Sequence, residues 1–193
     1  MEIAVIGTGF IGGILGNALA RAGHTVRFGS RHPGDDAVAD GSPATVVAVD
    51  EALDGADAVI LALPGPAVAE LATAVGSRLD GALVIDATNR MGAPVANSRA
   101  DLPDGVRYAR AFNTLGGETM ADPQFADGPA DLFFSAPAAD RDTVAAVVAD
   151  VGLRPVYLGP DQEGLVDSLF RVWIALAVGQ GRGRRLALRV IDH

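Results

Sequence analysis

The sequence predicts an α/β fold built on a doubly wound parallel sheet with helices on both faces. Apolar runs of strand length alternate along the chain with amphipathic segments of helix length, which is the pattern of βαβ units. Several of these runs are apolar throughout, as expected for strands covered on both faces. With 193 residues, 49% of them hydrophobic and 20% charged, the chain is large and apolar enough to fold around one substantial core.

The expected elements follow one another in regular alternation. The expected strands cover residues 2–6, 25–28, 44–49, 58–63, 83–86, 106–111, 132–135 and 155–158. The expected helices cover residues 11–22, 67–75, a short piece after Asn113, 141–151 and a long terminal segment from Gln162 onward. Gly179, Gly181 and Gly183 should interrupt the terminal helix, and residues 89–105, rich in glycine, proline and asparagine, should form a loop.

A Gly-x-Gly-x-x-Gly turn joins the first strand to the first helix. In such a turn Gly7 allows the tight bend, Gly9 lets the backbone approach a pyrophosphate, and Gly12 permits close packing of helix against strand. The helix that follows offers free N–H groups and a positive dipole end to phosphate. A purely structural turn is the alternative, because the chain has 24 glycines. We predict a Rossmann-type dinucleotide site at this turn. The later strand and helix segments predict a small C-terminal α/β extension that ends in a long helix.

The end of the second strand indicates which dinucleotide binds. NAD-specific folds place an acidic residue there for the ribose 2′-hydroxyl, whereas this chain has Ser30 and Arg31. A hydroxyl and a guanidinium suit a 2′-phosphate, so NADP is predicted. Asp35 and Asp36 follow shortly after, and two carboxylates there are unfavourable for binding a phosphate. The alternative is a solvated turn in which Arg31 has no binding role.

The composition excludes several classes of protein. The chain has no cysteine, which rules out disulfides and thiolate chemistry, and we predict no metal site. All fifteen basic residues are arginine, so Schiff-base and lysine acid–base mechanisms are excluded. A net charge of −9 argues against nucleic-acid binding. The longest apolar run is too short for a membrane span and no secretion signal is visible, so we expect a cytoplasmic protein with no membrane partner.

Polar candidates near the predicted cleft are few. Thr88 and Asn89, following Asp86 at the end of a strand, could orient the nicotinamide or the substrate, or could simply cap a turn. Asn113, after Phe112, could likewise contact a second ring system. We predict no catalytic acid or base, which favours direct hydride transfer over carbonyl reduction. The remaining titratable candidates are expected to be structural: His24, His32, His193, Tyr108 and Tyr157.

Several motifs together resemble the NADPH-dependent coenzyme F420 reductases over nearly the whole chain. They are Thr8-Gly9-Phe10-Ile11-Gly12, Gly29-Ser30-Arg31, Ala62-Leu63-Pro64, Asp86-Ala87-Thr88-Asn89, Arg110-Ala111-Phe112-Asn113-Thr114 and the terminal segment 167–191. The resemblance implies an NADP-binding Rossmann domain at 1–112 and a smaller part at 113–193 that completes a cleft, where NADP and the deazaflavin F420 exchange a hydride.

The same resemblance implies roles for individual residues. Thr8, Gly9, Phe10 and Ile11 would line the pyrophosphate, Ser30 and Arg31 would hold the 2′-phosphate, and Leu63 and Pro64 would edge the nicotinamide side. Gly65 and Pro66 replace the bulkier residues of the family, which leaves the acceptor open. The alternatives are reduction of another small acceptor, such as an imine, a quinone or a ferric chelate, and a non-catalytic NADP-sensing module.

The C-terminal segment allows two interpretations. Its apolar residues at helical spacing could pack on the same domain or form a homodimer, and Trp173 could instead line the deazaflavin pocket. A basic cluster follows, formed by Arg182, Arg184, Arg185 and Arg189. It could receive the phosphate and oligoglutamate tail of F420, or complement the end of a helix.

Overall fold

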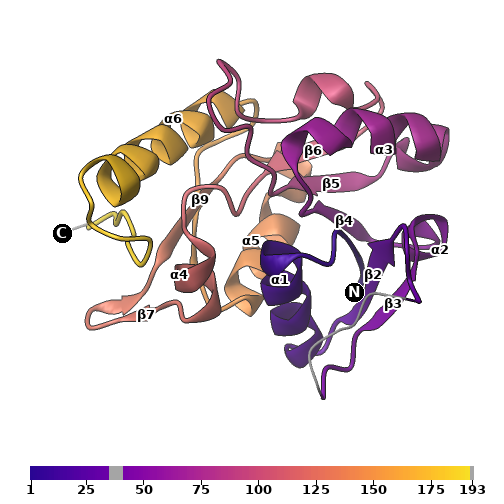
Figure 1. Ribbon diagram of the computed structural model, residues 1–193, viewed down its shortest axis with the longest axis horizontal. Coiled ribbons are helices and arrows are strands. Elements are labelled where there is room, and N and C mark those ends of the chain that lie inside the picture. Colours follow the sequence, from indigo (N-terminus) through magenta and orange to yellow (C-terminus); the bar gives the residue numbers. More distant parts are fainter. Residues whose placement is uncertain (35–40, 192–193) are drawn as a thin grey trace.

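A six-stranded parallel sheet forms the centre of the molecule in the computed structural model, which describes residues 1–34 and 41–191 (Figure 1). The strand order is β3-β2-β1-β4-β5-β6, so the chain winds outward in both directions from β1. Their bounds are β3 (Thr45–Ala48), β2 (Thr25–Ser30), β1 (Glu2–Ile6), β4 (Ala58–Leu61), β5 (Leu83–Asp86) and β6 (Arg107–Arg110). The predicted doubly wound parallel sheet is therefore confirmed. Asp35, Asp36 and His193 lie outside the described residues.

Helices cover both faces of this sheet. Their bounds are α1 (Phe10–Arg21), α2 (Val49–Leu53), α3 (Val68–Val75), α4 (Gly117–Ala121), α5 (Arg141–Asp150) and α6 (Glu163–Ile174). One core cluster joins the sheet to α1 and α5, and a second joins it to α2 and α3. Ile3, Ala4 and Val5 of β1 are fully buried, which explains why the central strands are apolar on both faces.

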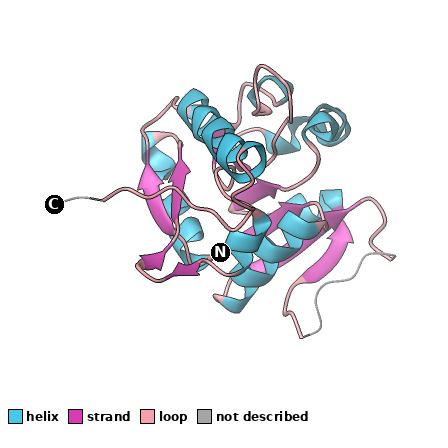
Figure 2. Cartoon of the chain, turned by 60° about the vertical axis from the view of Figure 1, so that its left-hand side comes forward, coloured by secondary structure: helices cyan, strands magenta, loops and turns pink. Residues whose placement is uncertain are grey.

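A small second sheet extends the structure beyond β6. The strands β9 (Asp131–Phe134) and β10 (Arg154–Tyr157) pair in parallel, with α5 between them in sequence. Arg110 and Ser135 exchange backbone hydrogen bonds of 2.8 and 3.1 Å, which attach β9 to the edge of β6 in antiparallel orientation. Figure 2 shows the small sheet on one side of the molecule, with the C-terminal segment extending across it. A functional division at residues 112 and 113 stays a prediction.

Two short elements differ from the sequence-based expectation. Helix α2 begins at Val49, where the predicted strand 44–49 still continued. It has only five residues, too few to show a helical period, although Asp50 and Glu51 complement the dipole in its first turn. The hairpin of β7 (Gln124–Phe125) and β8 (Gly128–Pro129) was also not predicted, because its strands have two residues each.

The terminal helix ends where the glycines predicted an interruption. Helix α6 continues as one π-helical turn, Ala175–Gly179, and residues 180–191 are not helical. Gly181 and Gly183 have φ of +65° and +83°, a region that side chains disfavour. The segment is fastened by a hydrogen bond of 2.7 Å from the Val190 N–H to the buried Asp131 carboxylate. No helix in the described part of the chain has the length and apolar character needed to span a membrane.

Candidate functional site

A cavity of about 710 Å³ opens at the carboxyl edge of the main sheet. The segments that follow β1, β2, β3 and β4 contribute to it, and they meet there because the strands are parallel. The predicted cofactor residues that line it are Gly7, Thr8, Gly9, Ser30, Arg31, Leu63 and Pro64. Of the other three, Phe10 lines a neighbouring cavity, whereas Ile11 and Gly12 line neither.

The glycine turn has the shape that a bound diphosphate requires. Gly7 has φ of +116°, and a Cβ there would lie 2.5 Å from the Ala62 carbonyl oxygen. A Cβ on Gly12 would lie 2.0 Å from the carbonyl oxygen of Gly7. At Gly9, in contrast, a Cβ would meet nothing within 4 Å. Gly7 and Gly12 are thus needed by the protein's own packing, whereas the space beside Gly9 is open for a ligand.

The start of α1 adds an electrostatic attraction for anions. Gly9 is its N-cap and provides no side-chain cap, and the first turn contains no acidic residue. The first N–H groups of a helix have no partners within the helix, and the dipole makes that end positive. The turn and the helix start therefore fit the diphosphate of a dinucleotide.

The cavity is also lined by the residues predicted to contact a 2′-phosphate. Ser30 is 8% exposed, and its Oγ accepts a hydrogen bond of 2.9 Å from the N–H of His32. The Arg31 side chain is 75% exposed, and its Nη1 lies 3.9 Å from Oε1 of the equally exposed Glu70. Asp50 lines the cavity as well. The exposed Arg31 guanidinium therefore lies beside the Glu70 carboxylate.

Asp86, at the end of β5, has a structural role. It is fully buried and accepts hydrogen bonds from the N–H of Thr88 at 2.8 Å, the N–H of Ser98 at 2.9 Å and the hydroxyl of Tyr108 at 2.7 Å. Burial and the adjacent Asp86 carboxylate raise the pKa of the Tyr108 hydroxyl, which stays protonated. Both groups are committed to this network, so neither is free to exchange a proton with a ligand.

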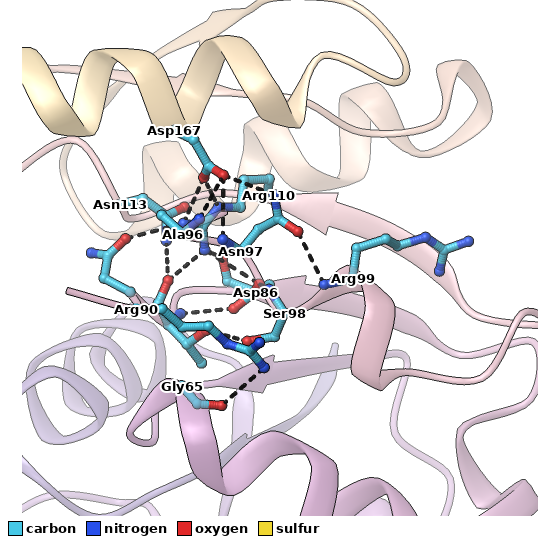
Figure 3. Close-up of polar contacts among 12 residues, drawn as sticks. Gly65, Asp86, Arg90, Ala96, Asn97, Ser98, Arg99, Arg110, Asn113 and Asp167 are labelled. Carbon is cyan, nitrogen blue, oxygen red and sulfur yellow. Dashed lines mark hydrogen bonds and ion pairs between the residues drawn. The ribbon is translucent and has the colours of Figure 1, made fainter. Parts of the chain in front are cut away.

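Arg110, the last residue of β6, connects Asp86 to α6 (Figure 3). Its guanidinium is fully buried and lies 3.3 Å from the Asp86 carboxylate and 2.8 Å from that of Asp167. It also donates to the carbonyl of Thr88 and, at 3.1 Å, to Oδ1 of Asn89. Sequence reasoning missed this arginine, although a charged residue near the end of an apolar strand was the available signal.

Asp167 of α6 was also missed and completes the same network. Its Oδ2 accepts from the N–H groups of Ala96 and Asn97 at 3.2 and 3.3 Å and from Nδ2 of Asn97 at 2.8 Å (Figure 3). The carboxylate thereby holds the loop after β5 and the guanidinium of Arg110 at once. An aspartate on the apolar side of the predicted helix, beside Val166 and Phe170, was the signal for it.

The structure brings the three predicted orienting residues together. Thr88 is 2% exposed and its Oγ1 lies 2.8 Å from Oγ of Ser98, whereas Asn89 is only half-buried. Asn113 is fully buried and donates from Nδ2 to the Thr88 carbonyl at 2.9 Å, while its Oδ1 has no partner among the described residues. Phe112, next to it, has φ of +68°. A buried orphan acceptor beside a strained residue is typical of a ligand site. The orienting roles themselves stay predictions.

The C-terminal basic cluster mainly fastens its own segment to α4 and the residues after it. Arg184 contacts the Glu118 carboxylate at 2.7 Å and Arg185 that of Asp122 at 2.6 Å. Trp173 is 3% exposed and donates from Nε1 to the Leu186 carbonyl at 2.8 Å. These contacts favour the packing interpretation for all three residues. Arg182 and Arg189 are exposed.

The other titratable candidates have structural partners or lie on the surface. Nε2 of His24 lies 2.9 Å from the Asp150 carboxylate and so joins the ends of α1 and α5. The Tyr157 hydroxyl donates to the Ala136 carbonyl at 3.0 Å. His32 is exposed at the rim of the cofactor cavity. The neighbouring cavity, of about 800 Å³, shares Thr8 and Gly9 with it and runs along α1.

Comparison with known proteins assigns this fold to a class. Residues 2–90 match the family described as NADP oxidoreductase, coenzyme F420-dependent, which confirms the resemblance seen in the sequence. No curated protein sequence matches the chain significantly. The chain is an NADP-dependent oxidoreductase of the Rossmann type.

Solved structures support this assignment. A crystal structure from Arthrobacter sp. FB24, provisionally named an F420-dependent NADP-reductase, is 25% identical with a TM-score of 0.82, and each chain covers 100% of the other. A hypothetical protein, SMa0349 from Sinorhizobium meliloti, is 27% identical with a TM-score of 0.69, covering 100% of this chain and 96% of that one. An imine reductase from Bacillus cereus BAG3X2, 17% identical with a TM-score of 0.72, shares the fold over 93% of this chain and 62% of its own.

Proposed function

We propose that the protein transfers a hydride between NADPH and the deazaflavin coenzyme F420. The observation that carries the proposal is the single cavity that is lined by the open turn at Gly9, by Ser30 and Arg31, and by Leu63 and Pro64. NADPH, when bound, supplies the hydride from C4 of its nicotinamide, and the acceptor ring receives it. The family match supports the choice of acceptor.

The residues supply binding and orientation. Gly7, Thr8 and Gly9 with the start of α1 would hold the diphosphate, Ser30 and Arg31 the 2′-phosphate, and Leu63 and Pro64 would border the nicotinamide. Residues 1–112 would thus bind NADP, and residues 113–193 would complete the cleft for the acceptor. Asn113, whose Oδ1 lacks a partner among the described residues, suits an amide or ring N–H donor of a ligand.

The chemistry of the site favours a ring-to-ring hydride transfer. Reduction of a carbonyl or imine requires a group that donates a proton to the product. The nearest candidates, Asp86 and Tyr108, are buried and bound to each other. Two stacked rings need only the correct distance and orientation.

Anaerobic mixing of the protein with NADPH and oxidised F420 tests the proposal. We expect the deazaflavin band to disappear together with the nicotinamide band, in equal amounts and at a rate proportional to enzyme. FMN, a quinone, a ferric chelate and a cyclic imine serve as parallel acceptors. Turnover with one of these and none with F420 would refute the proposed acceptor, and NADPH binding without turnover on any of them would indicate a sensing module.

Replacing Glu70 by glutamine is expected to tighten NADPH binding by about two- to fivefold, the size expected for an exposed ion pair. The carboxylate lies 3.9 Å from the Arg31 guanidinium and must yield to the 2′-phosphate. NADH, which lacks that phosphate, should bind as before. Glu51→Gln is the matched control, because Glu51 is exposed on α2 and does not line the cavity. Titration of both nucleotides by intrinsic fluorescence measures the effect, and equal changes for NADPH and NADH would argue against it.

A further inference from the structure

We propose that Arg110 and Asp167 are positioning residues that fix the side-chain amide of Asn89, so that its NH₂ group donates to the carboxamide oxygen of the nicotinamide. The inference rests on the proposed binding of NADPH in the cavity and does not depend on the acceptor. It assigns a role in the cofactor site to a residue of α6, an element outside the region that matches the family.

The chemistry of arginine determines which way the amide faces. A guanidinium has five N–H donors and no acceptor. It can therefore form a hydrogen bond only with the oxygen of an asparagine amide, not with its NH₂ group. Nη2 of Arg110 lies 3.1 Å from Oδ1 of Asn89, which directs Nδ2 away from the guanidinium. That Nδ2 donates to none of the residues that the structure describes, and Asn89 is half-buried rather than buried. A preset donor is therefore left for a ligand.

The guanidinium itself cannot turn. Its Nε and Nη2 contact Oδ1 of Asp167 at 3.0 and 2.8 Å, and its Nη1 donates to the Thr88 carbonyl and lies near the Asp86 carboxylate (Figure 3). Both carboxylates and the guanidinium are buried, where such contacts are strong and rearrangement is costly. The orientation of Asn89 is therefore set by β6 and α6 before any ligand arrives.

The backbone places this donor beside the nicotinamide end of the cavity. The N–H of Ala87 donates to the Leu61 carbonyl at 3.0 Å, so the connections after β4 and β5 leave the sheet side by side. One residue past Asn89, the Arg90 guanidinium reaches the carbonyl of Gly65 at 3.4 Å (Figure 3). Gly65 directly follows Pro64, which lines the cavity. Asn89 therefore follows β5 beside the connection after β4, which carries Leu63 and Pro64.

Asn89→Asp tests the donor without removing the contact to Arg110. The aspartate has the same shape and keeps an oxygen for the guanidinium, but it has no NH₂ group, so thermal stability should be retained. We expect NADPH affinity to fall about tenfold, the loss of one well-placed hydrogen bond. Affinity for 2′-phospho-ADP-ribose, which lacks the nicotinamide, should not change. Asn17→Asp, with the same change on α1 outside the cofactor cavity, should leave both affinities unchanged.

A double-mutant cycle tests the positioning role of Arg110. Arg110→Lys should weaken NADPH binding in the wild-type background but should cause no further loss of NADPH affinity in the Asn89→Ala background. The decrease in thermal stability caused by Arg110→Lys should be the same in both backgrounds. If Arg110→Lys does not fold, Asp167→Asn, which keeps an oxygen for the guanidinium, replaces it in the cycle.

Three results would overturn the inference. In the first, Asn89→Asp binds NADPH as tightly as the wild-type protein does. In the second, that variant weakens the binding of NADPH and of 2′-phospho-ADP-ribose equally. In the third, the losses of NADPH affinity in the double-mutant cycle are additive. Binding is the only readout, so a failure of F420 as acceptor would leave the inference standing.

Discussion

Replacing Arg31 by alanine is expected to weaken NADPH binding by about 10- to 100-fold while changing NADH binding less than about twofold. A hydrogen bond between a guanidinium and a phosphate contributes about 1.5–3 kcal/mol, and NADH lacks the 2′-phosphate that would receive it. The Arg31 side chain is 75% exposed and its contact to Glu70 is weak, so thermal stability should stay unchanged.

Fluorescence titration with both nucleotides, at one fixed ionic strength, measures the effect of Arg31→Ala. Arg21→Ala is the matched control, because it also removes one exposed arginine but does so at the end of α1, outside the cofactor cavity. If Arg31→Ala weakened NADH as strongly as NADPH, the assignment of the 2′-phosphate to this end of the cavity would be wrong.

Replacing Gly12 by alanine is expected to abolish NADPH binding and to lower the free energy of unfolding by about 2 kcal/mol or more. The new Cβ would lie 2.0 Å from the carbonyl oxygen of Gly7, so α1 must move away from β1 and deform the turn that receives the diphosphate. Chemical denaturation and NADPH titration measure the two losses separately.

Gly13→Ala provides a sharp control for this prediction. Gly13 is the next residue of the same helix, and a Cβ there would meet nothing within 4 Å. Alanine should raise helix stability by about 0.5–1 kcal/mol at this position and leave NADPH binding intact. Equal behaviour of the two variants would contradict the packing role of Gly12.

Much of the fold was predictable because its signals are local. Most strands of the main sheet are short apolar runs, and the glycine turn that begins at Gly7 indicates both the strand before it and the helix after it. The short helix α2 and the two-residue strands β7 and β8 were not predictable, since no period can develop over so few residues.

The cofactor end of the site was more predictable than its interior. Ser30 and Arg31 follow a recognisable strand at a known distance from the glycine turn, so their placement at the cavity follows from the topology. Arg110 and Asp167, in contrast, are 57 residues apart and meet only because α6 packs against the end of β6. Each is a charged residue among apolar neighbours in the sequence, but only the tertiary structure shows that the two side chains meet and are buried together.

Asp86 and Tyr108 show the same dependence on tertiary structure. Asp86 ends β5, and the sequence predicts a structural role for Tyr108 without indicating its partner. The structure places the Tyr108 hydroxyl 2.7 Å from the Asp86 carboxylate and buries both, so the pair forms a fixed support for the loop after β5.

Transfer of deuterium from NADPH labelled at C4 of the nicotinamide to F420 tests the central claim most directly. We expect one deuterium from one face of the nicotinamide to appear at C5 of the deazaflavin, detected by mass spectrometry, while the accompanying proton comes from water. Arg31→Ala should slow the transfer at low NADPH, and saturating NADPH should restore it. Reduced F420 without the label, or no reduction of F420 by the wild-type protein, would contradict the proposed hydride transfer.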